Sequence, residues 1–385
     1  MKFRGSYFSY LLVLLSFYFS MGIFVSMLSV YLDGIGKTPG DISLIVSASA
    51  IFALGMIPLV SYFHDKSGRP HMVNILVLAL SASAGLAFAF FRQTWILFIL
   101  NGLSISLILS VAPICEKLCA SGKFKYSSVR VWGAVGFALA AQTAGIVYQY
   151  VSPTLLFVLF AVSMTITIIG FWGVKEVYSE KQNQAKPEAK EKNSMFWLNR
   201  NFLLFLLVTF IFAGATGLNN TYIPMLMVER GQSVSLTGTV IFFGTLMEIP
   251  LILASAKFMD KLNAKTLLIA AFSLLTVQFL IYGLTDTYTP VMFSVILFRS
   301  VATMLFIMIT VKVVVSIVDE CYTVSALGLT ATINSLGSII FQNAGGRFVD
   351  VSSISQMFLV LVAFSALGLV ISLTLRIKKS NAIFQ

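Results

Sequence analysis

The feature that most constrains this chain is the recurrence of apolar runs long enough to cross a bilayer. A membrane-spanning helix needs about 20 apolar residues, and runs of this kind recur along the whole sequence. Hydrophobic residues make up 58% of the 385 residues and charged residues only 11%, whereas a soluble domain is about 25% charged. The sequence therefore predicts an all-α integral membrane protein.

Twelve transmembrane helices are predicted, and we expect them to form two pseudo-symmetric six-helix bundles. The predicted spans are 8–32, 42–63, 72–91, 95–115, 130–150 and 154–174 in the first half, and 201–228, 235–256, 266–284, 290–317, 326–348 and 354–375 in the second. The stretch 175–200 is the one long polar segment, and its core is rich in Lys, Glu, Gln and Asn. We interpret it as a solvated cytoplasmic linker between an N-terminal bundle (1–174) and a C-terminal bundle (201–385).

The formal net charge of +11 would suggest nucleic acid in a soluble protein, but here the basic residues lie between apolar runs. With both termini in the cytoplasm, four basic residues face outward, two lie within spans, and the other 20 of the 26 face inward. Cytoplasmic loops of membrane proteins carry this excess of Lys and Arg. We therefore expect a multi-pass protein of the bacterial cytoplasmic (inner) membrane with the bilayer, and no nucleic acid, as its partner.

Other features argue against an enzyme or a metalloprotein. Cys115, Cys119 and Cys321 lie at predicted cytoplasmic helix ends, where free thiols are expected, and they lack the spacing of a zinc site. No Walker A sequence, nucleophile–base motif or cofactor loop is present in the sequence. Lys2 and Arg4 precede an apolar run too long for a signal-peptide core, so we expect this run to remain as the first helix.

An internal repeat divides the chain. Ile57-Pro58-Leu59 recurs as Ile249-Pro250-Leu251, and the loop aspartates Asp65 and Asp260 are separated by about half the chain, as are Gly36 and Gly231. Duplicated six-helix halves with a binding site between them are typical of transporters in which one bundle rocks against the other.

Two sequence motifs give a family resemblance. The loop Asp65-Lys66-Ser67-Gly68-Arg69 resembles the helix 2–3 loop signature of the major facilitator superfamily, with an incomplete pattern. The stretch from Glu116 through 128–139, together with Glu248-Ile249-Pro250, resembles the lactose-permease-like branch, including its phenylpropionate-permease-like members. The resemblance implies proton-coupled uptake by alternating access, with Asp65, Arg69 and Asp260 in loops that control the conformational change.

The resemblance also assigns individual residues. Arg130 matches the helix 5 arginine that contacts the sugar in lactose permease, and Phe137 falls where that permease has a stacking tryptophan. Ala112 replaces the sugar-binding glutamate of helix 4, while Val301 and Met304 lie near the positions of the proton-coupling histidine and glutamate. Galactoside specificity is therefore not expected, and any coupling mechanism must be rearranged.

Glu248 and Arg299 are the ionisable residues deep within predicted spans, where a charge costs about 2.5–3.5 kcal/mol even on insertion scales. Our hypothesis makes Glu248 the protonation site or substrate anchor and Arg299 its partner, since burial favours the neutral acid and a nearby arginine favours the carboxylate. The alternative is a static ion pair that holds two helices together.

Further candidates lie nearer the helix ends and in helix 7. Glu116 and Arg130 either line the substrate cavity or extend to the membrane interface. Asn219, Asn220 and Tyr222 lie in a stretch with two glycines and a proline, which predicts a loosened helix that lines a cavity. The alternative for this stretch is helix packing through small residues. Phe137 and Tyr222 are candidates for stacking against a ring.

Together these features predict a proton-coupled importer of a small polar or ring-containing solute: a sugar, a nucleoside or an aromatic acid. The alternative is a drug or metabolite exporter of the same fold, although the glycine-proline motif of drug antiporters is missing from the stretch between Gly133 and Gly145. We expect a monomer that uses the proton gradient and no cofactor.

Overall fold

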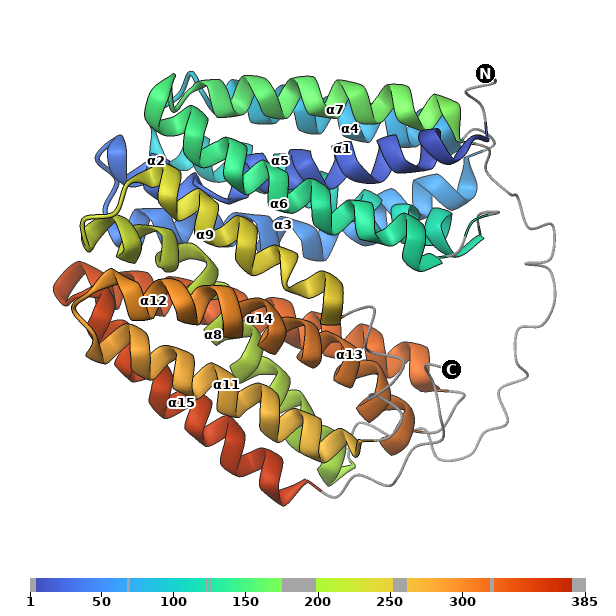
Figure 1. Ribbon diagram of the computed structural model, residues 1–385. Helices are drawn as coiled ribbons and strands as arrows, with labels where there is room; N and C mark the ends of the chain where they lie inside the picture. Colours follow the sequence, from blue (N-terminus) through green and yellow to red (C-terminus); the bar gives the residue numbers. More distant parts are fainter. Residues whose placement is uncertain are drawn as a thin grey trace.

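The structure is a computed structural model that describes residues 5–67, 70–121, 124, 126–174, 199–251, 262–318 and 322–375. The regular secondary structure of these residues is helical, and each of the twelve predicted spans coincides with one helix or with two or three consecutive helical elements (Figure 1). The predictions of an all-α membrane protein and of twelve spans in two bundles are therefore confirmed.

Six of the spans lie in the first half of the chain. They are formed by α1 (Tyr7–Val25) with α2 (Leu28–Gly34), α3 (Pro39–Lys66), α4 (Pro70–Ala87), α5 (Thr94–Ser121), α6 (Tyr126–Tyr150) and α7 (Leu155–Gly173).

The second half repeats this order. Its helices are α8 (Arg200–Glu229), α9 (Val234–Leu246), α11 (Ala264–Leu284), α12 (Tyr288–Ser294) with a π-helical turn η3 (Val295–Arg299) and α13 (Ser300–Ile317), α14 (Thr323–Val351) and α15 (Ile354–Thr374). The apolar stretch that begins with α9 extends to Leu251.

Ten described helical segments are long and apolar enough to cross a membrane. In α4 the apolar stretch His71–Ala87 is slightly shorter than these segments. The helix α14 has 29 residues, but it carries polar side chains that include Gln342 and Asn343. Because α14 packs along α3 and α8, these polar groups meet protein rather than lipid.

The internal repeat extends to the backbone of the loops. Gly36 and Gly231 both have φ of 81°, a left-handed conformation that glycine adopts without strain. Each closes the preceding helix in the same way, since the N–H of the next residue donates to a carbonyl five residues back, Leu32 in one half and Met227 in the other. The repeat is thus structural as well as sequential.

Helix packing within the two halves also repeats. The helix α1 packs on α6 and α7, as α8 packs on α14 and α15. Close approach at equivalent positions is made possible by glycine, because a Cβ on Gly136 would meet the carbonyl of Leu15 and a Cβ on Gly337 would meet the carbonyl of Phe210. Small residues allow this backbone contact between membrane helices.

The halves meet along two helix pairs, α3 with α14 and α6 with α9. In Figure 1 the two halves lie close together where α3 and α9 begin, and their helices diverge toward the end where α1 begins and α15 ends. We call the first the closed end. There Gly145 of α6 touches the backbone of α9 at Gly238, and Gly346 of α14 touches Ser43 of α3.

Replacing Gly136 by Leu should destabilise the N-terminal half, because the new side chain would collide with the backbone of α1. Overpacking of this kind costs about 1–3 kcal/mol, which should appear as a lower midpoint of thermal unfolding for the detergent-purified protein. The control is Gly55→Leu, since a Cβ at Gly55 meets nothing within 4 Å. Equal stability of the two variants would contradict the proposed close contact.

Candidate functional site

Glu248 and Arg299, the ionisable residues deep within the predicted spans, both lie in the C-terminal half. Arg299 is the last residue of the π-helical turn η3, and single π turns occur frequently at functional sites. Its guanidinium donates two hydrogen bonds to the side-chain oxygen of Asn220 on α8, from Nε at 3.1 Å and from Nη2 at 2.9 Å. A hydrogen bond from a charged donor is stronger than one between neutral groups, so this contact ties α8 to η3.

Glu248 lies near Arg299 because α9 packs against η3. A Cβ on Gly244 would lie 3.1 Å from the carbonyl of Val295, so α9 contacts the π turn there. Residues four apart lie on one face of a helix, which places Glu248 beside the residues that end the turn. Ser300 and Arg299 are among the groups that act electrostatically on its carboxylate.

Arg130 approaches this carboxylate from the other half. Its guanidinium lies over the ring of Tyr18, 4.8 Å from the ring centroid, a favourable cation–π contact. Ala141 and Gly145, which follow Arg130 along one stripe of α6, touch α9 at Gly238, so this stripe faces the C-terminal half. Glu248 interacts with Arg130 as well as with Arg299. The carboxylate is therefore within electrostatic range of one guanidinium from each half.

These side chains face the inside of the molecule. Glu248, Arg299 and Arg130 are half-buried, although protein atoms surround Glu248 and Arg299 densely. Close by on α8, Asn219 is buried and its side-chain oxygen has no hydrogen-bond partner. A buried acceptor without a partner is a place where a ligand or water can donate.

Phe137 lies two turns beyond Arg130 on the stripe of α6 that faces the other half. Its ring is half-buried, while its backbone packs against α1 at Gly22. Phe137 and Arg130 are thus both on the part of α6 that packs along α1.

The structure separates Tyr222 from this group. Its side chain is fully buried at the closed end, where the hydroxyl donates to the carbonyl of Pro39 at 2.8 Å and lies 2.8 Å from the Ser43 hydroxyl. Both partners belong to the other half. In this conformation Tyr222 joins the halves and does not lie beside Asn220.

The prediction of a loosened helix 7 is wrong, because α8 runs without interruption from Arg200 to Glu229 with Pro224 inside it. Gly214 and Gly217 serve helix packing instead, since each lies against a side chain of α14. The polar side chains are also bonded locally, and the Thr216 hydroxyl donates to the Phe212 carbonyl at 2.7 Å.

Several predicted site residues lie outside the described part. Nothing is described of Arg69 and Asp260, and the side chains of Asp65 and Glu116 are likewise not described. Their roles remain predictions from the sequence.

The sequence analysis missed a buried polar pair on α11. Gln278 and Tyr282 are fully buried, and the Gln278 amide donates to the Tyr282 hydroxyl at 2.9 Å. Tyr282 interacts with Arg299, so α11 contributes a third helix to the surroundings of the guanidinium. A glutamine in the middle of an apolar span is the signal that identifies this pair.

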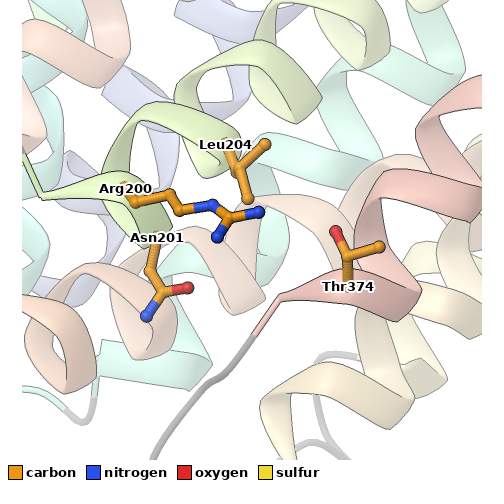
Figure 2. A pocket seen from close by; sticks show the side chains of 4 residues that line it. All are labelled: Arg200, Asn201, Leu204 and Thr374. Carbon is orange, nitrogen blue, oxygen red and sulfur yellow. The ribbon is translucent and has the colours of Figure 1, made fainter.

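Figure 2 shows a cavity of about 390 Å³ at the opposite end from the closed end, where α8 begins and α15 ends. It is lined by Arg200, Asn201, Leu204 and Thr374. Asn220 lies 20 residues further along α8 than Arg200, a distance of about 30 Å along a helix. The cavity is therefore separate from the charged group.

Twelve membrane-spanning helices in two structurally repeated halves are the architecture of a transporter of the major facilitator type. The chain matches the MFS_1 like family over residues 7–360, and it belongs to this family.

Individual relatives agree with this assignment. The chain is 23% identical to the uncharacterized transporter YwbF of Bacillus subtilis (strain 168), covering 94% of this chain and 91% of that protein. It is 22% identical to the probable 3-phenylpropionic acid transporter of Escherichia coli (strain K12), covering 70% and 72% of the two chains. The crystal structure of the nucleoside transporter NupG has the same fold, with a TM-score of 0.80 at 15% identity, covering 97% and 98% of the two chains.

The resemblance to the lactose-permease-like branch of the major facilitator superfamily is thereby confirmed. The protein is a multi-pass membrane transporter and not an enzyme.

The contact between Arg299 and Asn220 predicts thermodynamic coupling between the two residues. Asn220→Leu should lower the stability of the purified protein, because the guanidinium loses a partner worth about 1.5–3 kcal/mol. Adding Arg299→Leu should cost less than the sum of the single changes, with a coupling of about 0.5–3 kcal/mol, measured as thermal unfolding of all four proteins.

The matched control is Asn334→Leu, a change at an exposed asparagine on α14. It should shift stability by less than about 0.5 kcal/mol. Strict additivity of the Asn220 and Arg299 changes would contradict the contact.

Proposed function

We propose that the protein is a proton-coupled importer of a small polar or ring-containing solute, which works by alternating access. The observation that carries the proposal is that Glu248 interacts electrostatically with Arg299 of its own half and with Arg130 of the other. Protonation removes the charge that attracts both guanidinium groups, so proton binding and the relative position of the halves influence each other. Such linkage is reciprocal by thermodynamic necessity, which is what coupling of proton and solute requires.

Asn220, Asn219 and Arg130 supply hydrogen-bonding groups for the solute, and Phe137 supplies a ring on which it stacks. Sugars, nucleosides and aromatic acids all fit this set, since each combines a ring with polar substituents. The names of the relatives support the ring-containing classes, because they include a 3-phenylpropionic acid transporter and a nucleoside transporter. Glu116, next to Arg130 in the predicted arrangement, completes the proposed set.

We place both termini in the cytoplasm of a bacterial cell, in the inner membrane, because the distribution of Lys and Arg favours this orientation. The closed end then faces the periplasm. The moving bodies are residues 1–174 and 201–385, and residues 175–200 connect them as a linker. Asp65, Arg69 and Asp260 lie in the proposed gating loops on the cytoplasmic side. The protein acts as a monomer, with the proton gradient as its energy source and no cofactor.

The decisive experiment is a solute screen in proteoliposomes, with and without an imposed proton gradient directed inward. Sugars, nucleosides and aromatic acids form the panel. The native protein should accumulate one class above the equilibrium level only when the gradient is present. In Glu248→Gln the gradient should no longer drive accumulation, while exchange of solute across the membrane continues. Glu229→Gln, an exposed glutamate at the end of α8, is the control and should behave as the native protein.

Gradient-driven accumulation that survives in Glu248→Gln would overturn the role of Glu248. Solute loss driven by the inward proton gradient, or accumulation driven by an outward one, would instead support the alternative, an exporter of the same fold that exchanges solute for protons.

A further inference from the structure

Two hydrogen bonds at the closed end are equivalent under the internal repeat. The backbone N–H of Gly40, in the first turn of α3, donates to the carboxylate of Asp350 on α14 at 2.9 Å. The backbone N–H of Ser235, in the first turn of α9, donates to the side-chain oxygen of Gln149 on α6 at 2.8 Å. Each bond joins one half of the protein to the other.

The donors and the acceptors of these two hydrogen bonds occupy equivalent sequence positions in the two halves. Gly40 and Ser235 are 195 residues apart, as are Gly36 and Gly231. Gln149 and Asp350 are 201 residues apart, as are the packing glycines Gly136 and Gly337. In each half, therefore, the end of the fifth span supplies an acceptor for the start of the second span of the opposite half. We call these two contacts the reciprocal caps.

Each cap accepts a hydrogen bond from a backbone N–H that has no partner within the helix to which that N–H belongs. The first four N–H groups of a helix have no partner within the helix, and an oxygen at this end also meets the positive end of the helix dipole. In α3 and α9 the side chains of Thr38 and Ser233 accept the N–H groups of Asp41 and Leu236. The reciprocal caps bind the N–H one residue earlier in each helix, so both halves contribute to closing both helix ends.

The two caps differ in strength. Asp350 is a carboxylate, whereas Gln149 is a neutral amide, and hydrogen bonds to charged acceptors are about twice as strong as neutral ones. Beside the Asp350 cap lie the two contacts of the Tyr222 hydroxyl and a hydrogen bond from Asn343 to Ser47 at 3.0 Å. The position equivalent to Tyr222 is Met27, which has no hydroxyl to offer.

We propose that the reciprocal caps form the gate that holds the closed end shut, and that the Asp350 cap contributes most of its strength. Both caps must break when the closed end opens, because each joins residues of different halves. The proposal concerns the conformational change and does not depend on which solute is carried.

The test measures the distance across the closed end with spin labels. Phe90 and Leu284 are exposed residues of opposite halves at that end, and cysteines at these two positions carry the labels in a protein without its native cysteines. Asp350→Ala should move the population toward longer distances by roughly 10-fold, the usual weight of a charged hydrogen bond. Gln149→Ala should move it about 3-fold, and Asp350→Asn should fall between Asp350→Ala and the native protein.

Two further variants make the test specific. Ser235→Pro removes the N–H that Gln149 accepts, and proline is tolerated in the first turn of a helix. Combined with Gln149→Ala, it should add no further shift, because both changes remove the same bond. Asp33→Ala, at an exposed aspartate of the same end, is the control and should leave the distances unchanged.

An unchanged distance distribution in Asp350→Ala, or additive effects of Ser235→Pro and Gln149→Ala, would overturn the proposal. Because the readout is a distance in the purified protein, this outcome is independent of the transport assays that test Glu248.

Discussion

Charged and polar side chains inside an apolar helix bundle need interaction partners, and the rest of the structure depends on this requirement. A charged group at the centre of a bilayer is costly, and one buried without a partner is more costly still. Arg299 is therefore held by Asn220 of α8, and Glu248 lies with Ser300, Arg299 and Arg130. These contacts determine how α8, α9 and η3 lie against one another, and they bring α6 of the other half into the same electrostatic group.

The internal repeat makes the backbones of the two halves similar, whereas the side chains proposed to act in transport differ between the halves. Turns, glycine contacts and helix packing recur at equivalent positions of both halves. Three side chains singled out above do not recur, since Glu248 corresponds to Met56, which precedes the repeated Ile57-Pro58-Leu59, while Asp350 corresponds to Gln149 and Tyr222 to Met27. A symmetric scaffold lets two bundles rock about a shared interface, while a proton site is needed only once in each molecule.

Most of the fold could be predicted from the sequence, and the candidate site only in part. Apolar length identified the spans because lipid excludes unpaired backbone groups and leaves the helix as the local solution. Glu248 and Arg299 were identifiable because charge is rare at that depth. The continuity of α8 was not, because the packing of Gly214 and Gly217 against α14 outweighs their weak helix propensity. The place of Tyr222 at the closed end depends on residues about 180 positions earlier in the chain.

The sequence by itself determined the number and order of the spans, the internal repeat and the presence of one acid and one arginine within the membrane-spanning part. These follow from local hydropathy and from comparison of the chain with itself. Only the tertiary structure decided that Arg299 binds Asn220, that Arg130 and Glu248 of opposite halves come within electrostatic range, and that Gln149 and Asp350 cap helices of the opposite half. The reason is that helix rotation and register between the bundles come from side-chain packing between distant segments, which no local pattern encodes.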